Sequence, residues 1–324
     1  MSAPVRGYYG KLPVSPEFLR LHAAGPELRE LDEWLERGVQ YAKAQSGSEW
    51  PALLAQADIW NFLFVPEGNG RVVCGALFAS RDQAGRSFPF LTYLLLERGD
   101  FLPAPFLIPL KCRRFLTSTR QLLQKLRTDL DWNDFRAHVE SLPAEVDTDT
   151  SLDVGFEDYV SHTTTREFWS SVYGESGQAQ ADCLEPESST RLQRDSDRSS
   201  RGVSWGVKLP LEKGRTVEHY DIPVRLEMQA RLHDAKRGTL RALVAFWNRT
   251  PSKVEPCLLL SFGRSSPNLT RFIVSPDVLD NAWYEWSPQA ANPEQNSAET
   301  QTASSTQVMD NTDVSLKCYL GSIH

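Results

Sequence analysis

The sequence predicts an α/β fold, in which amphipathic helices cover a sheet of buried strands. The prediction starts from two runs, residues 72–78 and 88–96, that are almost continuously apolar and rich in β-branched and aromatic side chains. Runs of this length and composition are typical of strands buried on both faces. A helix is the competing interpretation, but Gly75, Pro89 and the polar residues between the runs argue against it. We therefore expect two adjacent central strands.

The connection between the two runs is the stretch RDQAGRS, residues 81–87. Asp82 and Arg86 lie four residues apart across Gly85, which can adopt a positive φ, so the two side chains can form an ion pair across a tight turn. One interpretation is that this pair only holds the loop in place. The other is that the loop, at one end of the sheet, is a recognition edge for a partner.

A long amphipathic helix is predicted after Gly25, because Pro26 suits the first turn of a helix and apolar residues recur at helical spacing. Those apolar positions are Leu28, Leu31, Leu35 and Ala42. Before this helix, residues 7–13 are predicted to form an edge strand that bends into a loop. Residues 59–65 are predicted to form a further strand, joined to the run at 72–78 by a hairpin turn.

The composition divides the chain into an N-terminal domain, residues 1–142, and a C-terminal α/β part, residues 150–287. Two alternatives stay open for the second part, since its strands can form a separate domain or complete the same sheet. Residues 175–202 carry almost no apolar side chains and cannot bury enough surface to offset their chain entropy, so a disordered insertion is predicted there. Residues 288–324 are polar as well and are predicted to be a disordered tail.

The net charge limits the kinds of partner that the protein can bind, and the cysteines indicate its cellular compartment. The net charge is −7, so no strongly basic face is expected and nucleic acid is excluded as a partner. Basic residues in a predicted helix at 117–130 and just before it, among them Lys111 and Arg113, are expected to form a solvated helix face, with a binding site as the alternative. No apolar run resembles a secretion signal or is long enough to enter a membrane. The five cysteines form no paired motif, which indicates free thiols and a cytoplasmic protein.

The motifs that carry catalysis are missing from the sequence. No phosphate-binding loop, dinucleotide-binding motif or zinc-protease motif occurs, and the six histidines stand singly. Cys74 lies in a predicted buried strand, where its thiol is expected to be unreactive. We therefore expect no enzyme activity, cofactor or metal. The alternative is a hydrolase-type enzyme whose site assembles only in three dimensions, around a pocket near Asp82, His138 or Asp58.

Five motifs follow one another in a fixed order in the first part of the chain. They are Gly7-Tyr8-Tyr9-Gly10-Lys11-Leu12-Pro13, Trp34-Leu35, Trp60-x-Phe62-Leu63, Gly75-Ala76-Leu77, and Ser80-x-Asp82-x-x-Gly85-Arg86 with Phe88-Pro89. With this set the sequence resembles the TagF (ImpM) family, accessory proteins of the bacterial type VI secretion system, over about residues 7–96, and the resemblance fades by about 140. The sequence departs from the family where Glu17 replaces an aspartate, where the glycine before that aspartate is missing, and at Ala79, where proline is usual.

The resemblance implies a three-layer α-β-α sandwich around a mixed, largely antiparallel sheet, with residues 1–142 as a TagF-like domain. It implies regulation and not catalysis. The expected function is that of a post-translational repressor that binds the forkhead-associated scaffold protein of the secretion system, beside the kinase and phosphatase of that pathway. The expected mechanism is occlusion of the scaffold. The residues predicted to make the contact are Tyr8, Tyr9, Lys11, Asp82 and Arg86.

Overall fold

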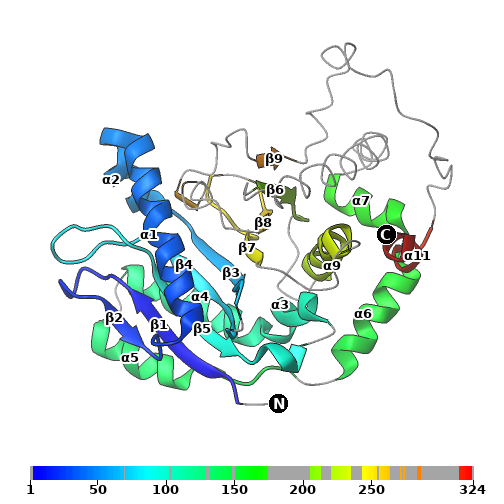
Figure 1. The fold of residues 1–324 in the computed structure, drawn as a ribbon, viewed down its shortest axis with the longest axis horizontal. Helices are drawn as coiled ribbons and strands as arrows, with labels where there is room; N and C mark the ends of the chain where they lie inside the picture. The colour runs from blue at the N-terminus through cyan, green and yellow to red at the C-terminus, as the bar shows by residue number, and fades with distance from the viewer. Residues whose placement is uncertain are drawn as a thin grey trace, which may run out of the picture.

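A computed structural model of the chain shows helices packed on a nine-stranded sheet (Figure 1). It describes residues 3–68, 70–101, 104–128, 131–147, 150–173, 205–212, 220–234, 243–253, 255–262, 271, 273–274, 283–285 and 314–322. The strands are β1 (Val5–Gly10), β2 (Leu19–Leu21), β3 (Ile59–Val65), β4 (Val72–Phe78), β5 (Phe90–Leu96), β6 (Trp205–Pro210), β7 (Leu243–Asn248), β8 (Cys257–Phe262) and β9 (Trp283–Glu285). They lie in the order β2-β1-β5-β4-β3-β7-β8-β6-β9. Neighbouring strands are antiparallel, except that β6 and β9 run parallel. The α/β class and the mixed, largely antiparallel sheet are confirmed.

The two central strands predicted from the sequence are β4 and β5. They pair along their whole length, from Val72 with Leu96 to Phe78 with Phe90, and every residue of both strands is buried. A strand that is covered on both faces has no polar side to alternate with an apolar one, which is why the sequence shows unbroken apolar runs. The prediction is confirmed, although β5 begins two residues later than the apolar run that starts at Phe88.

The strands of the C-terminal part extend this same sheet. β7 pairs with β3 from Asn61 with Trp247 to Val65 with Leu243, and β8, β6 and β9 follow in order. The pairing therefore answers the question that the sequence left open about these strands, because they complete the sheet of the N-terminal part. The division of the chain at residues 142 and 150 stays a prediction.

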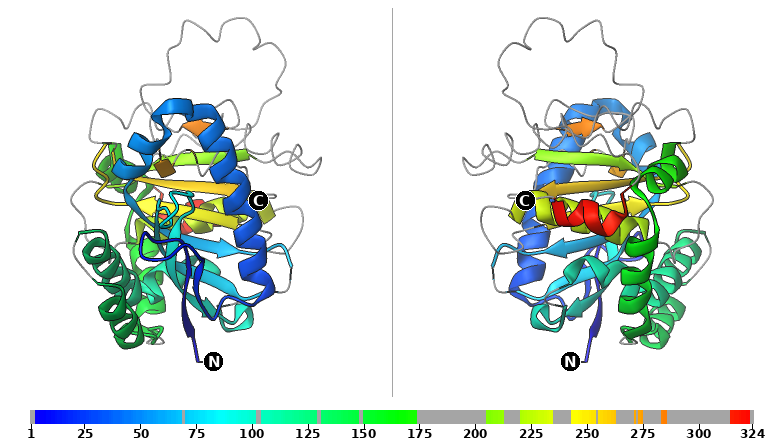
Figure 2. Two further views of the ribbon diagram at one scale, coloured as in Figure 1. Left: turned by 90° about the vertical axis from the view of Figure 1, so that its left-hand side faces the viewer. Right: turned by 90° about the vertical axis from the view of Figure 1, so that its right-hand side faces the viewer.

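The helices cover both faces of the sheet. They are α1 (Pro26–Ser46), α2 (Trp50–Gln56), α3 (Ile108–Lys111), α4 (Arg113–Thr128), α5 (Trp132–Ser141), α6 (Thr150–His162), α7 (Thr165–Tyr173), α9 (Asp221–Asp234) and α11 (Leu316–Ser322), with short 3₁₀ turns η1 (Gly47–Glu49), η2 (Arg98–Phe101) and η3 (Pro105–Leu107). In the opposite views of Figure 2, α1 lies in front of the sheet in one and α11 in the other.

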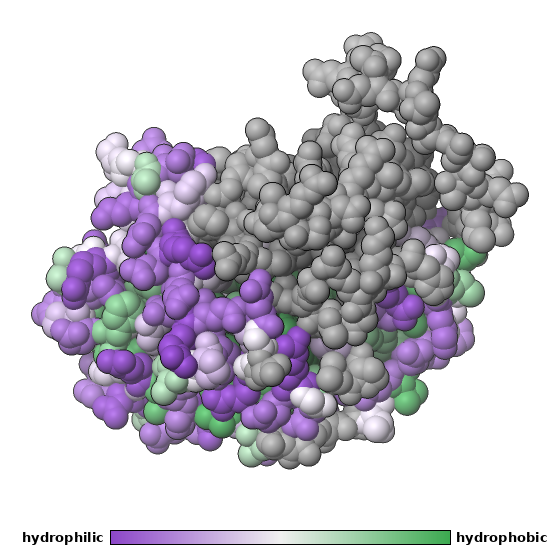
Figure 3. All heavy atoms as spheres, viewed as in Figure 1, coloured by the Kyte–Doolittle hydropathy of each residue, from purple (hydrophilic) through white to green (hydrophobic). Residues whose placement is uncertain are grey.

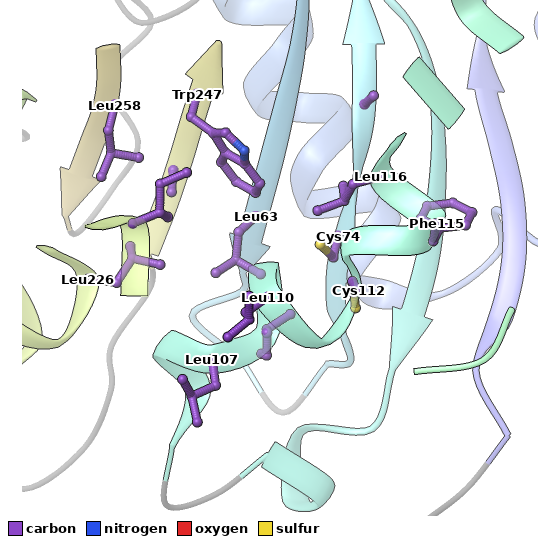
Figure 4. Close-up of a cluster of buried hydrophobic side chains, with 14 of the residues drawn as sticks. Leu63, Cys74, Leu107, Leu110, Cys112, Phe115, Leu116, Leu226, Trp247 and Leu258 are labelled. Carbon is purple, nitrogen blue, oxygen red and sulfur yellow. The ribbon is translucent and has the colours of Figure 1, made fainter. Parts of the chain in front are cut away.

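Side chains alternate between the two faces of each strand and so feed two main apolar cores. In β4, Val73 and Leu77 pack in the core under α1, whereas Cys74 and Phe78 pack in the core that contains α4, α5, α6 and α9. Figure 4 shows part of the second core, where Leu63 of β3, Trp247 of β7 and Leu226 of α9 meet. The two halves of the chain thus share one core as well as one sheet.

Cys74 and Cys112 lie close together inside this second core (Figure 4). Their fully buried thiols interact, and the pKa of Cys74 is raised first by the hydrogen bond with Cys112 and then by burial. Both effects keep the thiol protonated, and only the thiolate is a good nucleophile. The structure therefore agrees with the expectation that Cys74 is unreactive.

Two predictions concerned segments without secondary structure. The insertion at residues 175–202 lies outside the described residues. The prediction of a disordered tail at 288–324 is wrong for the end of that segment, because residues 316–322 form α11. Leu316 and Leu320 of this helix are almost fully buried. The two leucines are four residues apart and share one face of the helix, so α11 forms where the rest of the protein supplies an apolar surface.

Candidate protein-interaction site

Two loops meet at one end of the sheet, and we call them together the two-loop platform: residues 11–18, between β1 and β2, and residues 80–87, between β4 and β5. The strand pairing brings them together. β5 lies between β1 and β4 and is antiparallel to both, so the start of β5 lies beside the ends of the other two. Tyr9 accordingly pairs with Leu91, and Phe78 with Phe90.

Asp82 connects the two loops. Its Oδ2 accepts from Lys11 Nζ at 3.0 Å and from Arg86 Nε at 2.7 Å, and its Oδ1 accepts from the backbone N–H of Arg86 at 2.8 Å. The Asp82 side chain is fully buried, whereas the Arg86 side chain is 60% exposed. The ion pair predicted from the spacing of Asp82 and Arg86 is confirmed, and Gly85 between them has φ +81° as expected.

The backbones of the two loops are joined as well. The N–H of Gln83 donates to the carbonyl of Ser15 at 3.0 Å, and the Arg86 guanidinium donates to the carbonyl of Pro16. Within the second loop, Asp82 N–H donates to Arg86 carbonyl at 3.0 Å and Gly85 N–H to Asp82 carbonyl at 2.9 Å. The platform is therefore held in one conformation by contacts within the chain.

The ionised form of Asp82 is favoured by these contacts. Burial alone would raise the pKa of this carboxyl group, but the backbone N–H of Arg86 and the side chains of Lys11 and Arg86 donate to it, and the charge of Lys11 attracts it. Together the donors outweigh burial and lower the pKa from 3.8 to about 2.

This lowered pKa predicts a loss of stability in acid. A carboxyl group whose pKa is lower in the folded state stabilises the fold above its unfolded pKa, and the contribution disappears as the pH falls through the folded value. For Asp82 the window runs from about pH 4 down to about pH 2. Urea unfolding at several pH values should show this component in the wild type and lose it in Asp82→Asn. Glu17→Gln, an exposed residue of the same platform, should keep the wild-type profile, and an unchanged profile in Asp82→Asn would contradict the assignment.

Aromatic rings support the platform from below. Phe18 stacks on Tyr9 with ring centroids 5.3 Å apart, and it meets Phe88 edge to face at 4.9 Å. Lys11 Nζ lies 4.8 Å from the centre of the Phe18 ring. Burial and a hydrogen bond to Asp32 raise the pKa of the Tyr9 hydroxyl well above its usual value, so Tyr9 stays neutral.

The structure does not bring all five predicted contact residues to one surface. Tyr8 and Tyr9 are adjacent in β1 and therefore lie on opposite faces of the sheet. Tyr8 is buried in the other core, against Phe90, Trp132 and Phe135, so its place on the predicted surface is wrong.

Three of the other predicted residues hold the platform rather than forming its outer surface. Lys11 and Asp82 are buried, and Tyr9 is partly buried. Each of the three side chains contacts other residues of the protein, as described above. Arg86 alone of the five is exposed.

Apart from Arg86, the outer surface of the platform is built from residues that the prediction did not name. Gln83 and Ala84 are exposed, and so is Val14, at 54%. The described surface seen in Figure 3 is mostly hydrophilic with scattered hydrophobic residues. Among the described residues, two large hydrophobic side chains are strongly exposed: Val14 on the platform and Val154 of α6, at 65%. The sequence signal for Val14 was its position directly after the GYYGKLP motif.

An apolar recess lies near the platform, between α1, α2 and the start of β5. Trp50, Phe88 and Ile273 are among the residues that line it. The lining has no ionisable side chain, so this recess does not provide the convergent groups that the hydrolase alternative requires.

The three positions named for the hydrolase alternative have other partners. Asp82 holds the platform, Asp58 accepts from the backbone N–H of Ser252 at 2.9 Å, and the exposed His138 ring bonds the carbonyl of Asp134. Within the described ranges, no group of three or more histidine, cysteine, aspartate or glutamate side chains could hold a metal ion. No helix in the described part of the chain is long and apolar enough to cross a membrane.

The basic residues around α4 make contacts within the protein. Lys111 pairs with Asp153 at 2.9 Å and Arg113 with Asp147 at 2.9 Å. Arg120 donates to the carbonyl of Ile59 at the start of β3 and to Asn248 at the end of β7. These three side chains bind segments of the chain together, so the expectation of a solvated helix face is wrong for them, whereas Lys125 and Arg127 are exposed.

Fold and platform define an α/β protein that presents two interlocked, ordered loops at one end of its sheet. Residues 7–142 match the model of the TagF N-terminal domain, described as type VI secretion system-associated. The crystal structure of PA0076 from Pseudomonas aeruginosa PAO1 is similar, with a TM-score of 0.50 and 16% identity over 85% of this chain and 96% of that one. At this identity the similarity concerns the fold alone. No curated protein sequence matches the chain.

Proposed function

We propose that this type VI secretion system-associated protein is a cytoplasmic, non-enzymatic, post-translational repressor of the secretion system. Its partner is the forkhead-associated scaffold protein, and the kinase and phosphatase of the same pathway are its further regulators. Helices on both faces of the sheet support the three-layer α-β-α sandwich that this role would share with the TagF family.

The two-loop platform is the observation that carries the proposal. Its internal polar groups are bonded to one another, and its outer residues are exposed and ordered. A surface held in one conformation before binding loses little conformational entropy on association, so more of the contact energy becomes affinity. The platform also lies entirely within the residues that match the TagF domain.

The mechanism that follows is occlusion. Val14, Ala84 and Arg86 project from the platform and would contact the scaffold, while Asp82 and Lys11 hold the two loops in register. A scaffold surface covered in this way is unavailable for assembly with other components. The protein then acts by occupying a surface and needs no reacting group.

Charged substitutions on the platform should weaken scaffold binding without unfolding the protein. In Val14→Asp/Ala84→Arg, both exposed contacts are lost, and the expected loss of affinity is at least ten-fold, or about 1.4 kcal/mol. Surface substitutions of this kind change the free energy of unfolding by only about 0.5 kcal/mol. Isothermal titration calorimetry and co-purification with the forkhead-associated scaffold protein measure the effect.

The matched control is Val154→Asp. Val154 is the other strongly exposed valine, and it lies on α6, outside the platform. It should bind the scaffold as the wild type does. If the double variant binds normally, or if the control loses binding equally, the platform is not the contact surface.

A further inference from the structure

The described end of the chain, residues 314–322, docks on the protein as a separate peptide would. Its first residues are extended and pair with the segment between α6 and α7. The N–H of Thr165 donates to the carbonyl of Val314 at 2.9 Å, and the N–H of Leu316 donates to that of Thr163 at 2.9 Å. Thr164 and Ser315 between them form an antiparallel bridge.

The helix that follows inserts two leucines. Leu316 and Leu320 are 1% and 2% exposed, and both join the core that contains residues of α6 and α9. Tyr319 is partly buried against the same core. α11 packs on α6 and α9, so these two helices form the groove that receives it.

Polar contacts fix both the end and the exposed side of α11. The guanidinium of Arg231, on α9, donates to the carbonyl of Leu320 at 3.1 Å and is itself held by Glu227. This contact satisfies a carbonyl in the last turn, which has no partner within a helix. On the exposed side, Lys317 pairs with Glu157 of α6 at 3.1 Å.

A seven-residue helix is too short to be stable in water by itself, since isolated helices need about 12 residues or more. The helical form of α11 therefore depends on its contacts with the groove. The preceding described residues are 283–285 in β9, and the sheet strands pair without any contribution from the segment. Apolar anchors at i and i+4 on one face of a helix are typical of the way in which grooves bind helical peptides.

We propose that the groove between α6 and α9 is a peptide-binding site, which the chain's own C-terminal segment occupies in cis and which a helix of a partner protein binds by displacing it. The partner helix carries two leucines four residues apart, with a basic residue after the first and an extended residue before it. This site is distinct from the two-loop platform and does not rest on the function proposed for it. In Figure 1 α11 lies on the opposite side of the molecule from β1 and β2.

The segment is covalently part of the chain, so its effective concentration at the groove decides how tightly a competing peptide must bind to displace it. A tethered segment acts at an effective concentration on the order of 1 mM, so a free peptide of equal intrinsic affinity binds weakly while the segment is in place. Displacing residues 314–322 from the groove should therefore raise the affinity of the protein for a separate peptide.

The test uses the full chain with Leu316→Asp/Leu320→Asp, which removes both anchors. The probe is a fluorescent synthetic peptide of residues 312–324 with Cys318→Ser, and fluorescence anisotropy measures its binding. We expect the variant to bind the probe at least ten-fold more tightly than the wild type does. A probe with both leucines replaced by aspartate should bind neither protein. Equal binding to variant and wild type, or no binding to a variant with a wild-type circular dichroism spectrum, overturns the proposal.

A second measurement on the wild type covers the case in which the variant does not fold. The amides of Thr165 and Leu316 should exchange with solvent together, and faster than those of β4 and β5, because displacement of the segment exposes both without unfolding the sheet. An excess of the probe peptide should leave the sheet amides unchanged. Exchange of Thr165 and Leu316 as slow as that of the sheet amides would show that the segment never leaves the groove, and would overturn the proposal.

Discussion

Replacing Phe246 with alanine should lower the free energy of unfolding by about 3–5 kcal/mol, the usual cost of removing a fully buried phenylalanine. Phe246 belongs to β7, in the second half of the chain, but its ring packs against residues of the first half. Its centroid is 5.6 Å from that of Trp34 on α1 and 6.0 Å from that of Phe62 on β3. The substitution leaves a cavity under α1 that neither half can fill alone.

The effect should extend to the TagF domain. Because β3 and β7 pair and share the core under α1, the substitution should destabilise residues 7–142 and the C-terminal strands in one transition. Urea unfolding followed by tryptophan fluorescence gives the free energy, and hydrogen exchange of β4 and β5 amides reports on the first half. Val154→Ala, at an exposed site, is the control and should stay within about 0.5 kcal/mol of the wild type. Unchanged protection of β4 and β5 would show that the two halves unfold independently.

Gly10→Ala should be nearly as damaging, because two separate costs add at this position. Gly10 ends β1 with φ +132°, where other residues are strained by about 1–3 kcal/mol. An added Cβ would also lie 2.1 Å from the carbonyl oxygen of Pro89 and 2.8 Å from the Cα of Phe90. Such overpacking costs about 1–3 kcal/mol more. The expected total is about 3 kcal/mol or more in thermal or urea unfolding.

Gly47→Ala separates the two costs. Gly47 also has a positive φ, +51°, but no atom lies within 4 Å of an added Cβ. It should therefore show only the backbone strain, about 1–3 kcal/mol, because residues other than glycine rarely adopt its φ of +51° with ψ of −124°. Gly10 lies directly before the platform, so Gly10→Ala should also weaken scaffold binding at temperatures where the variant stays folded. Equal destabilisation by both substitutions would mean that the close approach of β1 to Pro89 is relaxed at little cost.

The candidate site could be predicted from the sequence only where it is local. Asp82 and Arg86 are four residues apart, so their ion pair followed from spacing and from the glycine between them. Lys11 lies 71 residues from Asp82, and although the resemblance placed both on one surface, no pattern in the chain indicates that they form an ion pair. The opposite placement of Tyr8 and Tyr9 was available from the sequence, because adjacent residues of a strand face opposite ways.

The C-terminal segment shows the same limit. Leu316 and Leu320 stand at helical spacing, but the helix that joins them is shorter than the length at which helices form in water. Whether it folds depends on the groove between α6 and α9, and polar composition alone could not reveal that groove.

The amino-acid sequence by itself determined which segments are buried strands and amphipathic helices, the turn at Gly85, and the resemblance to the TagF family. Those properties depend on periodicity and on neighbours within a few positions. The tertiary structure alone decided that β7 continues the sheet from β3, that Lys11 reaches Asp82, and that the end of the chain docks on α6 and α9. Each of these contacts joins segments far apart in the chain, and its free energy depends on surfaces that exist only once the sheet has formed.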